Sequence, residues 1–116
     1  MAGKYSEDNL LPILLNEEQE SVTTASPALS VEKSLSIIDS TSNAVNATLA
    51  DGTIVGQVKR ICMSNASNAS DVTIASPSNA DRKVADFNAV TDYLELIWNG
   101  TGWMVTANIG VALAAS

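Results

Sequence analysis

The sequence has no histidine and a single cysteine, Cys62, among its 116 residues. Histidine is the commonest general base and metal ligand in proteins, so its absence removes the usual centre of acid–base and metal chemistry. One cysteine forms neither an internal disulfide nor a thiolate zinc cluster, and no histidine is present to activate it. No glycine-rich phosphate-binding motif occurs either. We therefore expect no enzymatic activity, no cofactor, no metal and no small-molecule substrate.

Basic residues are also few. Six lysines and arginines stand against thirteen aspartates and glutamates, which gives a net charge of −7. A protein with this net negative charge repels polyanions, so we expect neither nucleic acid nor membrane as a partner. No apolar run is long enough to cross a bilayer. The apolar stretch Leu10–Leu15 follows Glu7 and Asp8, where a secretory signal needs positive charge, so secretion by that route is not expected.

Large apolar side chains are scarce. The chain has two tryptophans, two tyrosines and one phenylalanine, and alanine supplies much of its 46% hydrophobic content. A core of this composition contains few of the large side chains that bury the most apolar surface area. We expect neighbouring chains to complete its burial.

The acidic residues are unevenly distributed along the chain. Residues 1–32 hold six acids and one base, whereas the remainder holds seven acids and five bases. This shift, with Ser26-Pro27 near its end, predicts an extended N-terminal arm over residues 1–30 and a β domain over residues 31–116. The apolar residues of the arm are its expected anchors on a neighbouring molecule: Leu10, Leu11, Ile13, Leu14 and Leu15.

Beyond the arm the apolar pattern has a period of two, which is typical of β-strands. Asp51-Gly52 predicts a hairpin turn after one of these strands, and Asn99–Gly102 predicts another between the last two. In the strand that follows Gly56, Lys59 alternates with Ile61 and Met63, so neither of its faces is purely apolar. We expect a small antiparallel β-sandwich or barrel of six to eight short strands, including residues 35–39, 45–49, 58–63, 72–74, 84–87, 93–98 and 103–109.

Trp98 and Trp103 flank the last predicted turn and can pair across its two strands. Exposed tryptophans near a loop tip can stack on sugars, whereas a core short of large side chains favours burying them. We expect burial. The residues predicted to pack the core or a trimer interface are Trp98, Trp103, Phe87, Tyr93 and Leu96.

Several of these segments occur together, in order, in a known kind of module. They are Leu49–Thr53, Gly56–Lys59 with Ile61 and Met63, Val72–Ile74 with Pro77, and Leu94–Trp103 with its distinctive Trp-Asn-Gly-Thr-Gly-Trp hairpin. This run resembles a small β module of structural proteins of tailed bacteriophages, particularly capsid decoration (cement) proteins, and also tail or fibre components.

The resemblance implies a virion structural protein that stabilises an icosahedral capsid as a homotrimer at three-fold positions. Its partner would be the major capsid protein, and its place the outer surface of a capsid assembled in the host bacterial cytoplasm. The arm would contact the shell through Leu10–Leu15. The alternative is a tail or fibre-tip module that binds a host-surface glycan through loops such as residues 64–70 and 99–102.

Overall fold

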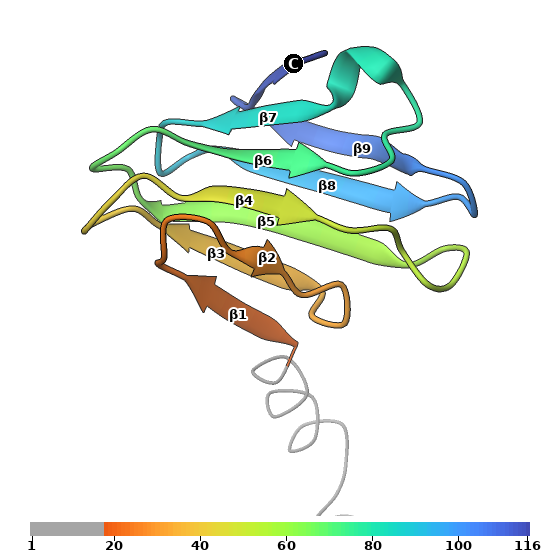
Figure 1. Ribbon diagram of the computed structural model, residues 1–116, viewed down its shortest axis with the longest axis horizontal. Helices are drawn as coiled ribbons and strands as arrows, with labels where there is room; N and C mark the ends of the chain where they lie inside the picture. The colour runs from red at the N-terminus through yellow and green to blue at the C-terminus, as the bar shows by residue number, and fades with distance from the viewer. Residues whose placement is uncertain (1–17) are drawn as a thin grey trace, which may run out of the picture.

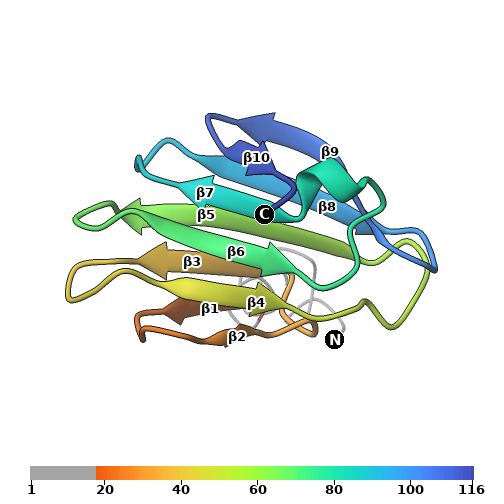
Figure 2. The ribbon, with the colours of Figure 1, turned by 45° about the horizontal axis from the view of Figure 1, so that its top comes forward.

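The computed structural model describes residues 18–116, which form two five-stranded β-sheets packed face to face (Figure 1). Sheet A has the strand order β1-β3-β5-β8-β9, and sheet B has the order β10-β7-β6-β4-β2. Figure 2 shows the strands of sheet B side by side in front of sheet A. The strands of sheet A are β1 (Gln19–Val22), β3 (Leu35–Asp39), β5 (Val58–Asn65), β8 (Tyr93–Trp98) and β9 (Trp103–Ile109). Those of sheet B are β2 (Ala28–Leu29), β4 (Asn46–Leu49), β6 (Ser70–Ile74), β7 (Val84–Phe87) and β10 (Ala112–Ala114), with a 3₁₀ turn η2 (Ala80–Arg82) before β7.

The first six strands alternate between the two sheets. Consequently β1, β3 and β5 lie parallel in sheet A, and β2, β4 and β6 lie parallel in sheet B. In register, Gln19 pairs with Leu35, which pairs in turn with Arg60. This winding is the one used by solenoid proteins, in which each coil is held by its neighbour. The remaining strands, β7 to β10, join by antiparallel pairing.

The structure confirms an all-β sandwich and corrects its details. Residues 18–116 contain ten strands rather than six to eight, the pairing is mixed rather than antiparallel, and neither sheet closes into a barrel. The predicted hairpin at Asp51-Gly52 is wrong, because β4 pairs with β2 and β6 in sheet B while β5 lies in sheet A. A turn motif shows that the chain reverses, but it does not show whether the next strand pairs with the last one or crosses to another sheet. The hairpin between β8 and β9 is confirmed.

The core lies between the sheets and is largely aliphatic. Alternate residues of each strand point inward, as the period of two predicts. The inward residues of sheet A that are fully buried include Ile38, Ile61, Leu94 and Leu96, and those of sheet B include Leu49, Val72, Ile74 and Phe87. The hydrophobic free energy of folding is therefore gained mainly between facing strands rather than within one sheet.

Part of the predicted arm belongs to the sandwich. Residues 19–29 form β1 and β2, which pair with β3 and β4, and their side chains Val22 and Leu29 are buried in the core. The anchors Leu10, Leu11, Ile13, Leu14 and Leu15 lie outside the described residues. No helix among residues 18–116 has the length and apolar character needed to span a membrane.

Candidate functional site

Trp98 and Trp103 meet across the β8–β9 hairpin and are buried at one end of the core. Their ring centroids are 5.4 Å apart in an edge-to-face arrangement, and their exposed fractions are only 7% and 2%. The Trp103 indole N–H donates a 2.9 Å hydrogen bond to the carbonyl of Ala50. Gly52 passes so close to Trp98 that a Cβ atom at this position would lie 2.4 Å from its Cγ. The pair thus fastens the loop after β4 onto the hairpin, and its ring faces are not available for stacking on a sugar.

The polar groups of the turn between the tryptophans are satisfied within the turn. The side-chain oxygen of Asn99 accepts hydrogen bonds from the backbone N–H groups of Thr101 and Gly102, both at 2.9 Å, and from the Thr101 hydroxyl at 3.0 Å. Gly100 adopts φ = 102°, a left-handed conformation that favours glycine. The sequence Asn-Gly-Thr-Gly is therefore explained by the geometry of the turn and, at Gly102, by the backbone of Ser76 and Ser78, which would lie 3.0–3.1 Å from a Cβ atom there.

The other predicted packing residues divide between the two faces of their sheets. Phe87 on β7 and Leu96 on β8 are fully buried in the core. Tyr93 points to the outer face of sheet A, where it is half-buried. The five sequence-predicted packing residues are thus not one site: four belong to the core, and Tyr93 belongs to a surface.

Sequence analysis did not anticipate a buried polar cluster around Lys59. This side chain is 1% exposed, and its Nζ donates hydrogen bonds to the carbonyls of Ser30 (2.6 Å) and Lys33 (2.8 Å), with Glu20 Oε2 at 3.8 Å. The same Glu20 oxygen accepts from the Ser36 hydroxyl at 2.6 Å and from the Ser30 backbone N–H at 2.8 Å. The cluster ties β1, β3, β5 and the loop after β2 together, so it holds the first coil of the chain in place.

A second cluster lies on the outer face of sheet A around Glu95. This carboxylate accepts hydrogen bonds from the Tyr93 hydroxyl (2.9 Å) and the Thr106 hydroxyl (3.1 Å), and forms an ion pair with Arg60 at 3.4 Å. The hydrogen bond from Tyr93, followed by that from Thr106, holds the pKa of Glu95 below its usual value. A carboxylate kept ionised and saturated with donors does not act as a general base, so the arrangement is structural.

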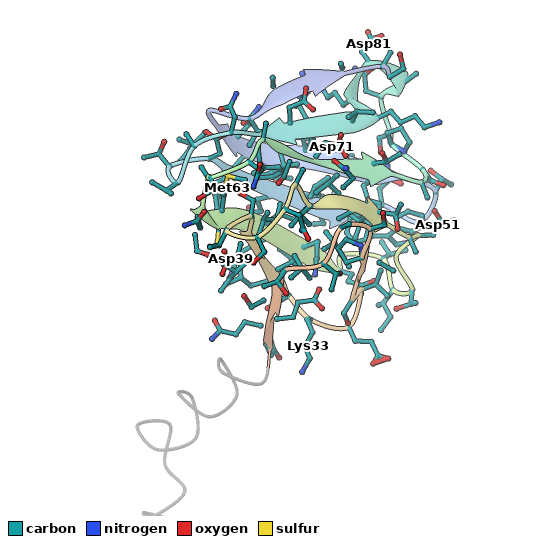
Figure 3. The ribbon with its side chains drawn as sticks, turned by 60° about the vertical axis from the view of Figure 1, so that its left-hand side comes forward. Lys33, Asp39, Asp51, Met63, Asp71 and Asp81 are labelled. Carbon is teal, nitrogen blue, oxygen red and sulfur yellow. The ribbon has the colours of Figure 1, made fainter. Side chains whose placement is uncertain are left out.

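No group of residues within 18–116 offers a set of ligands for a metal ion. Acidic side chains labelled in Figure 3, such as Asp51, Asp71 and Asp81, lie at separate places around the sandwich. Burial raises the pKa of the half-buried Cys62 thiol, which favours its unreactive protonated form. An open cavity of about 250 Å³ lies between the loop before β7 and strand β9, lined by Ser78, Asn79, Arg82, Trp103, Met104 and Val105.

Substituting Trp98 tests the structural role of the tryptophan pair. We expect Trp98→Ala to lower the free energy of unfolding by about 3–5 kcal/mol, because it removes a large buried aromatic side chain and leaves a cavity. The matched control is Val55→Ala, in the loop that follows Gly52, where the side chain is 70% exposed. Denaturant titration of the two variants should show a shifted midpoint for the first alone, and equal midpoints would contradict the assignment.

The Lys59 cluster predicts a pH dependence of stability. Burial lowers the pKa of Lys59 from 10.5 to about 8, although the charge of Glu20 partly opposes the shift. Between these pH values the unfolded chain holds a proton that the folded chain has lost, so this residue makes the fold more stable as pH rises through the window, by on the order of 2–3 kcal/mol. Cys62 and Tyr93 have raised pKa values, which act in the opposite direction.

The contribution of Lys59 to the pH dependence is therefore measured as the difference in unfolding free energy between the wild type and Lys59→Met. Unfolding free energies of both proteins are measured by denaturant titration at half-unit steps from pH 6.5 to 10.5. We expect the stability of the wild type relative to the variant to be constant up to about pH 7 and to increase above it. A difference that does not vary with pH would show that burial does not perturb this lysine.

The comparisons with known proteins return no relatives: the chain matches no protein-family model and no curated protein.

Proposed function

We propose that this chain is a virion structural protein that decorates and stabilises an icosahedral phage capsid. In this proposal it binds the major capsid protein on the outer surface of the particle as a homotrimer at three-fold positions. The proposal extends the resemblance of residues 49–105 to phage decoration modules. The chemistry of the described residues is compatible with it, since their polar clusters serve to hold strands together.

The observation that carries the proposal is that β1 is an edge strand of sheet A. Residues 10–15 precede β1 in the sequence, so the chain that carries them enters the sandwich at its perimeter. A chain of nine residues, from residue 10 to β1, spans at most about 30 Å. Leu10, Leu11, Ile13, Leu14 and Leu15 can thus reach a neighbouring molecule while the sandwich stays intact.

Many copies of one weak contact suit this role. Each subunit needs only a modest affinity for the shell, because a trimer bound through three arms gains from the high effective concentration of the second and third. The acidic residues Glu17, Glu18 and Glu20 lie directly after the leucines. Of these, Glu20 is engaged inside the sandwich by Ser30 and Ser36, and Glu18 accepts a 3.2 Å hydrogen bond from the Ser34 hydroxyl at an exposed position, so Glu17 is the first candidate to face basic residues of the shell.

One observation favours the alternative of a glycan-binding tail or fibre-tip module. The cavity beside β9 presents Ser78, Asn79 and Arg82, whose side chains could hydrogen-bond a sugar. The loops first suggested for this role are engaged internally: Asn99 binds its own turn, and Asn68 donates a 2.8 Å hydrogen bond to the carbonyl of Ser40. The cavity is thus the place where a glycan would be sought.

The proposal is tested with a double variant of the full chain, Leu11→Asp with Leu14→Asp, added to capsids that lack this protein. We expect the wild type to sediment with the capsids and the double variant to stay in the supernatant, because charged side chains cannot replace the apolar contacts. The matched control is Ile54→Asp with Val55→Asp, two exposed apolar residues of the sandwich. Binding of the double variant at wild-type occupancy would exclude the arm, and absence of wild-type binding would exclude decoration.

A further inference from the structure

The outer face of sheet A carries apolar rows where a solvent-facing sheet would be mostly polar. The outward positions of its strands fall into rows in register across the sheet. One row is Val58, Ile97 and Met104, and another is Ile37, Cys62, Tyr93 and Ile109. Three of these side chains are substantially exposed, namely Val58 (37%), Met104 (42%) and Ile109 (60%), and the others are half-buried. An antiparallel or mixed sheet exposed to water usually alternates apolar inward and polar outward, so this face departs from the pattern.

Sheet B of the same protein provides the contrast. Its outward positions on the three central strands are mostly polar or acidic, as at Asn46, Thr48 and Thr73. Asp71 on β6 stands directly opposite Asp86 on β7, and burial followed by the charge of Asp86 raises the pKa of Asp71. The outer face of sheet B is therefore polar enough to face solvent, whereas the outer face of sheet A exposes two apolar rows.

The charges on the outer face of sheet A nearly cancel. Between its two apolar rows lie Arg60 and Glu95, which form an ion pair, and the Tyr93 and Thr106 hydroxyls both donate hydrogen bonds to Glu95. Beyond that pair, the outward positions of β3, β5, β8 and β9 carry one more charge, Asp39 at the end of β3. Because Glu95 is already hydrogen-bonded within its own chain, covering this face costs less than burying an unpaired charge.

We propose that the outer face of sheet A is the surface through which copies of this chain associate. The inference rests on the homotrimer in the proposed function and names its interface. Two identical chains of net charge −7 repel each other, and this face is where they can approach with least repulsion. Three sheets turned toward a common axis would also supply the apolar burial that a core poor in aromatic residues lacks.

The size of the face fits this role. Strands lie about 4.8 Å apart and rise about 3.3 Å per residue, so five strands of four to eight residues cover roughly 500 Å² in projection. Protruding side chains add to this projected area, which is of the same order as the roughly 800 Å² per partner of a standard interface. Self-association of this chain is therefore sufficient to explain why apolar side chains are exposed on this face.

The experiment compares single substitutions on the two sheets of the full chain. Ile97→Asp places a charge in the centre of the apolar row on sheet A, and Thr73→Asp places the same charge at a half-buried outward position of sheet B. Molar mass is measured by light scattering after size exclusion, and folding by far-ultraviolet circular dichroism. We expect about three times the single-chain mass of 12.1 kDa for the wild type and Thr73→Asp, and a folded monomer for Ile97→Asp.

A second pair keeps the test valid if Ile97→Asp fails to fold. Ile109→Asp alters the most exposed apolar residue of the face, at the end of β9, and Thr48→Asp is its exposed control on sheet B. A folded Ile109→Asp that keeps the wild-type mass would overturn the inference. A monomeric wild type would also overturn it.

This outcome is independent of the capsid test. A wild type that is monomeric in solution yet decorates capsids contradicts the interface and leaves decoration standing. A wild type that associates through sheet A but never binds capsids supports the interface and contradicts decoration.

Discussion

The winding of the first six strands between two sheets is the constraint on which the rest of the structure depends. It stacks β1, β3 and β5 in parallel, and a parallel stack has no hairpin turns to fix its first coil. Buried Lys59 fixes it instead, through the carbonyls of Ser30 and Lys33 and the carboxylate of Glu20. The antiparallel strands that follow complete both sheets and bring Trp98 and Trp103 together at one end of the core. What remains for function is therefore the perimeter at β1 and the outer faces.

The fold class and most strand positions could be predicted from the sequence because alternation of apolar residues is a local signal. The β8–β9 hairpin was equally accessible, since Asn99–Gly102 combines turn chemistry with tryptophans on both sides. The crossing from β4 to β5 was not, because Asp51-Gly52 reports only that the chain turns. Strands β1 and β2 were missed because β1 is short and mostly polar and β2 has only two residues, and their burial depends on partners that lie far along the chain.

The candidate sites show the same limit. The alternation of Lys59 with Ile61 and Met63 indicated only that neither face of the strand is purely apolar, and the partners Ser30 and Glu20 are recognisable only in three dimensions. Tyr93 looked like its aromatic neighbours in sequence, yet it points outward into the row that contains Ile37 and Ile109. A pattern identifies residues that need burial, and the fold decides whether the core or another chain provides it.

The central claim is that this chain coats a shell, and its copy number in purified particles tests that claim most directly. If the proposal holds, purified phage particles contain both this chain and the major capsid protein, and quantitative mass spectrometry measures their ratio. Decoration predicts a ratio approaching one copy per shell subunit. A handful of copies per particle would contradict it in favour of a tail or fibre module, and complete absence would contradict any virion role.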